Sequence, residues 1–175
     1  MLYRYGDDVP RLGRDVYVAP NATVIGRVEL GDESSIWFGT VVRGDVGVIT
    51  VGARSNIQDN CVVHVTEGKT GTWIGDDVVI GHRAIVHECR VEDAALIGMG
   101  CVLLDGSVIG RGAIVGAGAV IREGQVVPPF ALVAGVPGEV RKILPESSLE
   151  ARRAHAHHYV LLARAYRTGA CAPLP

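Results

Sequence analysis

The sequence has few aromatic residues and few leucines. Phe, Trp and Tyr together number 9 in 175 residues and Leu numbers 12, whereas Val and Ile together number 39. Gly occurs 23 times, well above its average frequency of about 7%. Because β-branched residues and Gly are disfavoured in helices, this composition excludes a helical bundle. With so few large side chains, the core must be built from many small aliphatic residues.

Charge of one sign, long apolar runs and paired cysteines are also missing. A formal net charge of −2 offers no basic surface for nucleic acid. The opening residues MLYRYGDDVP contain no apolar core of a signal peptide, and no later stretch is long enough to cross a membrane. The four cysteines include no CxxC pair, which favours reduced thiols. We therefore expect a cytoplasmic protein with no nucleic-acid or membrane partner.

A six-residue repeat dominates the chain between Val18 and Val127. Its eighteen successive leading positions are all Val, Ile or Leu, and fourteen of the seventeen steps between them are six residues long. The exceptions are two insertions, after Val42 and Val63, and one short step after Val86. In four extended residues, the leading residue and the small residue two positions before it point to the same side. The other two residues turn the corner, where Gly, Asn and Asp are frequent.

Three hexads complete one triangular coil, so the repeat predicts a mainly β protein, a parallel β-helix of about six coils. Cys61 and Cys101 fall at small interior positions of the repeat. After the repeat, Tyr159, Leu162 and Tyr166 lie on one face of an expected helix. The expected segments are a lead-in at 1–17, the β-helix at 18–132, a connector at 133–145, the C-terminal helix at 146–168 and a tail at 169–175.

Three histidines interrupt the repeat at positions where a polar ring is unusual. His64 and His87 occupy equivalent positions in successive coils, so both point outward from one face at the strand spacing of about 4.8 Å. His82 falls at a corner, roughly 16 Å along the chain from His87. Since zinc lies about 2.0–2.1 Å from its ligands, His82 of the same chain cannot join the pair. A neighbouring chain could supply it, which predicts a cyclic homotrimer with three interfacial metal sites.

Four more polar residues lie near these histidines in the same register. Arg43 lies directly under the first histidine of the stacked pair, and Asp45 follows two residues later. Gln58 and Asp59 lie at the corner, with Asp59 one coil beneath the corner histidine. If the corner of one chain meets the face of another, all of these side chains converge on one site.

The hexads resemble those of left-handed β-helix proteins with hexapeptide repeats, and this resemblance gives the expected hand of the coils. Within that group, the stretches SSIWFGTVVRGDV, SNIQDNCVVHV, IGHRAIVHEC and IGMGCVLLDG resemble the γ-class carbonic anhydrase family. The resemblance covers nearly the whole chain, from VAPNATVIG through the C-terminal helix. It implies a homotrimer that interconverts carbon dioxide and bicarbonate at zinc sites, with iron or cobalt in some members.

The resemblance also implies roles for individual residues. His64, His82 and His87 match the metal ligands of that family, and the middle one is supplied by an adjacent subunit. The other matches are Arg43 and Asp45 to an intersubunit ion pair, Gln58 to the residue that orients metal-bound water or bicarbonate, Asp59 to the acidic partner of that glutamine, and Tyr159 to a helix tyrosine that reaches toward the site.

The sequence departs from the archaeal prototype of that family in two places. Val46 stands where the prototype has a glutamate directly after the matched aspartate. The loop TEGKTGTW is shorter than the acidic loop of the prototype, which carries a proton-shuttling glutamate. Glu67 is the residue of this loop nearest to the shuttle position. Both departures affect the export of the proton, so we expect modest or condition-dependent turnover.

The sequence leaves two other classes of function open beside zinc-dependent, reversible hydration of carbon dioxide. One is a hexapeptide acyltransferase that uses coenzyme A, or a related small ester or thioester hydrolase. The three-histidine cluster disfavours the acyltransferase, because such enzymes often have a single catalytic His on a loop. The other is a non-catalytic trimeric scaffold, in which the same ligands would hold structural zinc.

Overall fold

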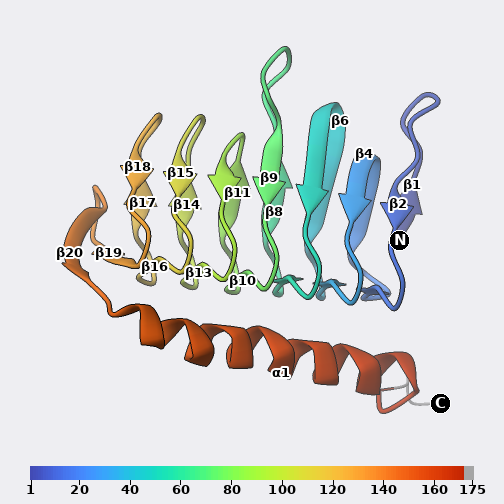
Figure 1. The fold of residues 1–175 in the computed structure, drawn as a ribbon. Coiled ribbons are helices and arrows are strands. Elements are labelled where there is room, and N and C mark those ends of the chain that lie inside the picture. The colour runs from blue at the N-terminus through green and yellow to red at the C-terminus, as the bar shows by residue number, and fades with distance from the viewer. Residues whose placement is uncertain (172–175) are drawn as a thin grey trace.

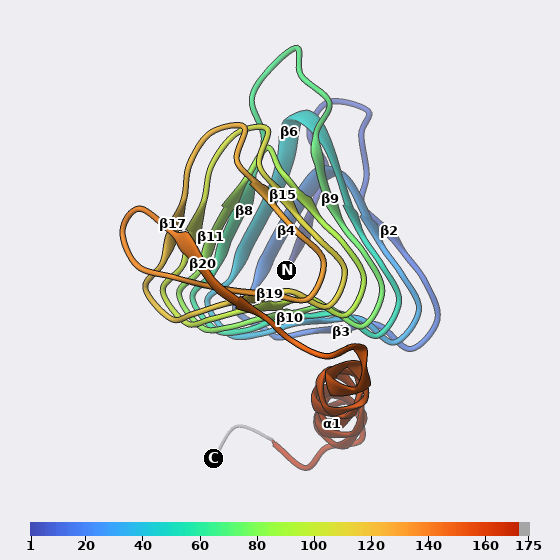
Figure 2. The same ribbon diagram turned by 60° about the vertical axis from the view of Figure 1, so that its left-hand side comes forward.

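The chain folds into a left-handed β-solenoid of about seven turns, followed by one long helix (Figure 1). The computed structural model describes residues 1–171, so the expected tail at 169–175 lies partly outside the described residues. Viewed along the solenoid, each turn is a triangle with three faces (Figure 2). The mainly β fold class and the C-terminal helix predicted from the sequence are confirmed.

Each face is a stack of short parallel strands, with one strand from each turn. The first face contains β1 (Leu2–Tyr3), the first part of β4 (Thr23–Leu30) and of β6 (Val41–Val51), β8 (Val62–His64), β11 (Ile85–His87), β14 (Val102–Leu103) and β17 (Val120–Ile121). The second face contains β2 (Arg11–Leu12), the remainder of β4 and β6, β9 (Thr72–Ile74), β12 (Arg90–Val91), β15 (Val108–Ile109) and β18 (Val126–Val127).

The third face carries the helix. It contains β3 (Tyr17–Val18), β5 (Ser35–Ile36), β7 (Asn56–Ile57), β10 (Val79–Ile80), β13 (Leu96–Ile97), β16 (Ile114–Val115) and β19 (Ala131–Ala134), and the antiparallel strand β20 (Glu139–Ile143) closes it. A short 3-10 helix, η1 (Glu146–Ser148), leads into α1 (Leu149–Arg167). The helix runs back along the third face from the last turns toward the first (Figures 1 and 2).

The core consists of the leading residues of the hexads, stacked in register. On the third face, Ile36, Ile57, Ile80 and Ile97 are aligned in successive strands and are completely buried. The small interior positions are buried as well, and burial raises the pKa of the Cys61 thiol to about 11. A large and a small apolar residue in each hexad therefore fill the triangular interior.

The solenoid begins earlier in the chain than the repeat does. Strands β1 and β2, in the segment expected as a lead-in, both pair in parallel with β4 and form an additional turn. The segment between them has no hexad spacing, so the periodicity does not reveal this turn. The segment expected as a connector contains β20, which folds back onto β19.

An aromatic cluster attaches α1 to the first turns of the third face. The Trp37 ring contacts Tyr159 and Tyr166 edge to face, with centroids 5.5 and 5.2 Å apart. Beyond the cluster, the Arg167 guanidinium pairs with Asp15, 2.6 Å away. Such aromatic pairs stabilise a packed interface beyond the area that they bury. They fix α1 over the strands that lead to the candidate site.

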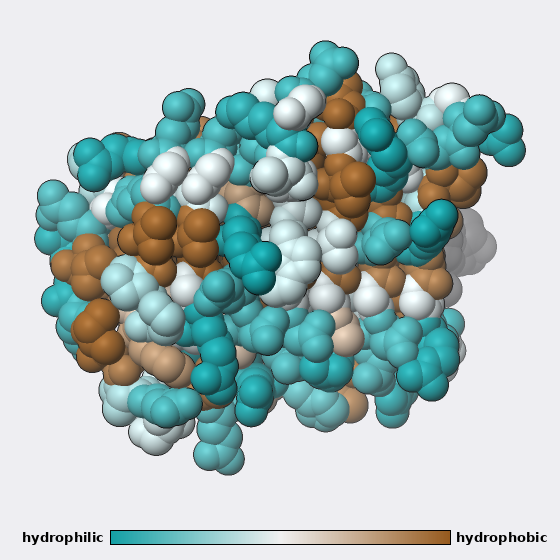
Figure 3. Space-filling model, turned by 45° about the horizontal axis from the view of Figure 1, so that its top comes forward, coloured by the Kyte–Doolittle hydropathy of each residue, from teal (hydrophilic) through white to brown (hydrophobic). Residues whose placement is uncertain are grey.

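The face of the molecule drawn in Figure 3 is mostly hydrophilic. In the view of Figure 3, hydrophobic side chains form separate patches among polar and charged ones. Within residues 1–171, no helix has the length and apolar character needed to cross a bilayer.

Candidate metal centre

His64 and His87 form a stacked pair on the first face. They are the last residues of β8 and β11 and are partners in the strand register. Nδ1 of His64 lies 3.2 Å from Nε2 of His87, and the ring centroids are 5.2 Å apart. Both rings are partly exposed on the outside of the solenoid. Two imidazole nitrogens at this separation match the donor chemistry of a zinc ion, which prefers nitrogen and sulfur ligands.

Asp45 connects His64 to Arg43. One carboxylate oxygen lies 3.1 Å from Nε2 of His64, and the other accepts a hydrogen bond of 2.5 Å from the Arg43 guanidinium. Burial alone would raise the pKa of the Asp45 carboxyl, but the hydrogen bonds from Arg43 and His64 outweigh it and hold the pKa below its ordinary value. Arg43 and Asp45 thus pair within one chain, beside the histidines.

Asp105 holds His87 from the other side, and sequence reasoning missed it. Its Oδ1 lies 2.7 Å from Nδ1 of His87, while Oδ2 accepts hydrogen bonds from Thr66 (2.7 Å) and Lys69 (2.9 Å). The hydrogen bond from Thr66, assisted by Lys69 and His87, lowers the pKa of the Asp105 carboxyl far below its usual range. The hexad register could have revealed Asp105, because this residue lies one coil after His87, at the turn that follows the strand.

Glu88 is a second residue that sequence reasoning missed. It is nearly completely buried and accepts hydrogen bonds from the backbone N–H groups of Thr66 and Gly71, at 3.1 and 2.8 Å. The hydroxyl of Thr70 adds a third hydrogen bond, of 3.2 Å. Glu88 therefore fixes both ends of the loop at 65–71, whose Thr66 contacts Asp105. Glu67, the expected shuttle residue, is exposed on this loop.

His82 lies at the corner between the third and first faces, with Asp59 beneath it. Its Nδ1 lies 2.8 Å from Oδ2 of Asp59, in agreement with the register. Gln58 is buried and donates its side-chain amide to Asn56 Oδ1, at 3.1 Å. The family pattern suggested Asp59 as the partner of Gln58, but in the structure Asp59 pairs with His82 instead.

A cavity of about 440 Å³ adjoins Gln58 and His82 under the helix. Tyr159 and His155 of α1 line the same cavity. Burial raises the pKa of the Tyr159 phenol, and the nearby Asp59 carboxylate adds to the effect. The structure thus brings Tyr159, Gln58 and His82 together, and separately brings Arg43, Asp45, His64 and His87 together.

One chain does not bring these two groups into a single metal site. Within the described residues, no three His, Cys, Asp or Glu side chains are placed to hold one metal ion. The residues present fit zinc in donor type but supply only two imidazoles at one place. A zinc site built on this pair would need at least one further ligand from outside this group.

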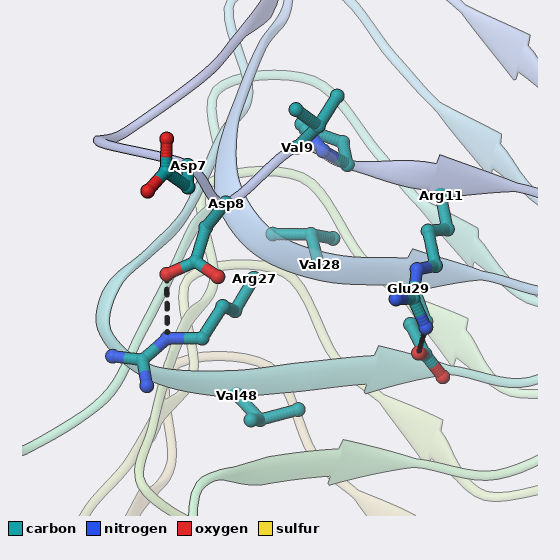
Figure 4. Close-up of a pocket in the computed structure, with 9 residues that line it drawn as sticks. Asp7, Asp8, Val9, Arg11, Arg27, Val28, Glu29 and Val48 are labelled. Carbon is teal, nitrogen blue, oxygen red and sulfur yellow. Dashed lines mark hydrogen bonds and ion pairs between the residues drawn. The ribbon is translucent and has the colours of Figure 1, made fainter.

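A further cavity lies at the first turns, away from these residues (Figure 4). Four of its charged side chains form ion pairs, Arg27 with Asp8 and Arg11 with Glu29, each at 3.3 Å. None of the residues predicted for the site lines this cavity. Its lining contains no histidine, so it offers no nitrogen ligands comparable to the histidine pair.

The repeat and the solenoid define a hexapeptide-repeat protein. The family model described as "Bacterial transferase hexapeptide (six repeats)" matches residues 10–44 and 88–123. A hexapeptide transferase family protein from Anaplasma phagocytophilum has the same fold, with a TM-score of 0.89 and 37% identity over 95% of this chain and 98% of that chain.

Curated relatives specify the family further. A probable carbonic anhydrase of Methanocaldococcus jannaschii is 51% identical over 86% of this chain and 94% of that protein. The mitochondrial γ carbonic anhydrase 2 of Arabidopsis thaliana is 42% identical over 90% of this chain, which spans 59% of that relative's length. The chain belongs to the γ-class carbonic anhydrase family of lyases, and the family predicted from its motifs is confirmed.

Proposed function

We propose that the protein catalyses the reversible hydration of carbon dioxide to bicarbonate at zinc sites between the subunits of a homotrimer. His64 and His87 of one protomer and His82 of a neighbouring copy would hold each metal. The observation that carries the proposal is the division of the ligands: two imidazoles stacked 3.2 Å apart and the third at a corner. The names of the relatives at 42% and 51% identity support the reaction.

The surface around the histidine pair supports a protein interface there. An outward column of apolar side chains runs along the first face in strand register and consists of Val41, Val62, Ile85, Val102 and Val120. Val62 and Ile85 are each about two-fifths exposed and stand two residues before His64 and His87. Contiguous exposed apolar surface is typical of interaction sites. A second copy covering this column would bring its corner close to the pair.

Residues of the chain would orient the metal ligands and the reacting water. Zinc held by three imidazoles would lower the pKa of bound water to about 7 and so would supply a nucleophile at neutral pH. Asp105 keeps the Nδ1 proton of His87 in place and leaves Nε2 as the donor to a metal. Asp45 and Arg43 hold His64. Gln58, at the end of the cavity, orients the water or the bicarbonate product, and Tyr159 closes that end.

The chain has few side chains near the histidines that could carry the proton away from the site. The backbone N–H of Val46 bonds to Asp45, and its side chain has no carboxyl group to relay a proton. Glu67 is exposed on the short loop, with the anchored Thr66 between it and the histidines. We therefore expect turnover that depends on the buffer concentration, because an external base has to accept the proton.

The test is stopped-flow hydration of carbon dioxide by protein loaded with zinc, cobalt or ferrous iron. Activity is expected in the wild-type protein and in the His157→Ala control, whose histidine is exposed on α1. His82→Ala is expected to abolish it. Wild-type activity no higher than that of His82→Ala would reject the proposal. If metal removal dissociated the trimers of such an inactive protein, the zinc would be structural.

A further inference from the structure

The cavity beside Gln58 extends along the third face as a groove. Its floor follows one column of the solenoid, just after the strands. The backbone N–H of each member of this column donates to the carbonyl of a strand residue in the next turn, and the members are Trp37, Gln58, Gly81, Gly98 and Gly116. The first two have large side chains, and the next three have none. The column is therefore filled at its start and open over the three glycine turns. At the strand spacing of about 4.8 Å, the open part is roughly 10 Å long.

Two of the three glycines of this column are also required by backbone packing. A Cβ on Gly98 would approach the backbone nitrogen of Ala117 to 2.5 Å, and one on Gly81 would approach that of Met99 to 2.8 Å. Neither position accepts a side chain without displacing the next turn. The groove is thus a built-in feature of the packed turns.

The walls of the groove are apolar, and its polar groups lie at one end. Val79, Leu96 and Ile114 are aligned in register along one side, and Met99 and Ala117 line the corner. The polar side chains that line the cavity are Gln58, His82, His155 and Tyr159, all at the Gln58 end or on the helix above it. A ligand that matches this surface has a polar head at Gln58 and an unbranched apolar tail over the glycines.

The volume exceeds what carbon dioxide needs. At about 440 Å³ the cavity lies within the range of about 300–1,000 Å³ that is typical of sites for larger organic ligands. Bicarbonate is a carboxylate that carries a hydroxyl group. A fatty-acid anion has the same head, with an alkyl chain in place of the hydroxyl. A carboxyl head at Gln58 would place that chain in the groove.

We infer that the same site hydrolyses esters or thioesters of short straight-chain fatty acids, with the acyl chain lying in the groove over Gly81, Gly98 and Gly116. The inference rests on the proposed metal site, which would activate the water. The water oxygen forms a bond to the acyl carbon, and the bond from that carbon to the alcohol oxygen or thiol sulfur breaks. The leaving group takes up one proton of the water, and the products are the fatty acid and an alcohol or thiol.

The first test measures binding without turnover. Hexanoate and acetate are titrated by calorimetry into the zinc-loaded trimer and into the metal-free protein. Hexanoate is expected to bind at least about tenfold more tightly than acetate in both forms, since each buried methylene favours transfer out of water. Equal affinities would overturn the inference, and would be the result if a second copy of the chain filled the groove.

The second test measures hydrolysis with a chain-length series. The values of kcat/KM are compared for the acetyl, butyryl and hexanoyl esters of p-nitrophenol and for the matching thioesters. The hexanoyl to acetyl ratio is expected to be at least about ten for the wild type and for a Val126→Trp control on the second face. In Ile114→Trp, which fills the far end of the groove, the ratio is expected to fall toward one. A flat series in the wild type, or an unchanged ratio in Ile114→Trp, would overturn the inference.

The outcomes separate this inference from the proposed function. If the protein hydrates carbon dioxide but its kcat/KM for esters does not change with chain length, the proposed function is supported and the acyl-binding role of the groove is rejected. If kcat/KM for ester hydrolysis rises with chain length and carbon dioxide is not hydrated, the proposed reaction is rejected and the acyl-binding role of the groove is supported. Oxygen esters and thioesters are compared at the same chain length, so the preferred leaving group is identified by the same data.

Discussion

The carboxylate of Asp105 lies 2.7 Å from Nδ1 of His87 and binds the loop at 65–71 through its other oxygen. This contact fixes the ring orientation and the protonated nitrogen of His87. The opposite nitrogen, Nε2, faces His64. Asp105, in the adjoining coil, therefore sets the direction in which the proposed metal ligand His87 points, and the loop in turn holds Asp105.

Asp105→Asn is expected to weaken metal binding about 10–100-fold, because outer hydrogen-bond partners of a ligating histidine have effects of that size. Competition between the protein and a chelator for zinc measures the change, and the visible spectrum of the cobalt form reports ligand geometry independently of activity. Asp7→Asn, at an exposed position, serves as the control. Wild-type zinc affinity in Asp105→Asn would show that the contact has no bearing on the metal.

Glu88→Ala is expected to lower the free energy of unfolding by about 1–3 kcal/mol, because it leaves the N–H groups of Thr66 and Gly71 without their acceptor. Urea denaturation measures the loss, and hydrogen exchange should show the loop at 65–71 opening before the strands. Glu67→Ala removes an exposed carboxylate of the same loop and should change stability little. Equal stabilities of the two variants would contradict the anchoring role of Glu88.

The buried cysteines should react much more slowly with thiol reagents than the exposed one. Burial raises the pKa of Cys61 to about 11 and that of Cys89 to about 12, so at pH 8 fewer than about one in a hundred of these thiols is the reactive thiolate. Cys171 is exposed. A disulfide reagent at pH 8 should therefore modify one thiol per chain rapidly and the others only on unfolding. Rapid modification of a second thiol would show that the core opens readily.

Ile85→Lys is expected to dissociate the proposed trimer, because it places a charge in the outward apolar column next to His87. Sedimentation or light scattering measures the mass of the assembly. Val126→Lys introduces the same charge at an exposed position on the second face and should leave the mass unchanged. A trimer that persists in Ile85→Lys would place the interface on another face.

The sequence predicted those parts of the site that follow from the hexad register. His64 and His87 stack because equal positions in successive coils are neighbours, and Asp59 lies beneath His82 for the same reason. Asp105 lies one coil after His87 within the unbroken repeat, so the register offered this contact although it was not predicted. Glu88 escaped prediction because its partners Thr66 and Gly71 lie on an inserted loop, where the period carries no information about contacts. The turn built from β1 and β2 escaped for the same physical reason, since the chain between these strands has no repeat.

The central claim is that each metal site takes His64 and His87 from one chain and His82 from another. The most direct test mixes the unfolded His64→Ala and His82→Ala variants in equal amounts, refolds them together and measures carbon dioxide hydration. Each variant alone should be inactive. In mixed cyclic trimers about a quarter of the interfaces carry all three histidines, so about a quarter of wild-type activity should return. A mixture as inactive as its components, although trimeric, would contradict the account.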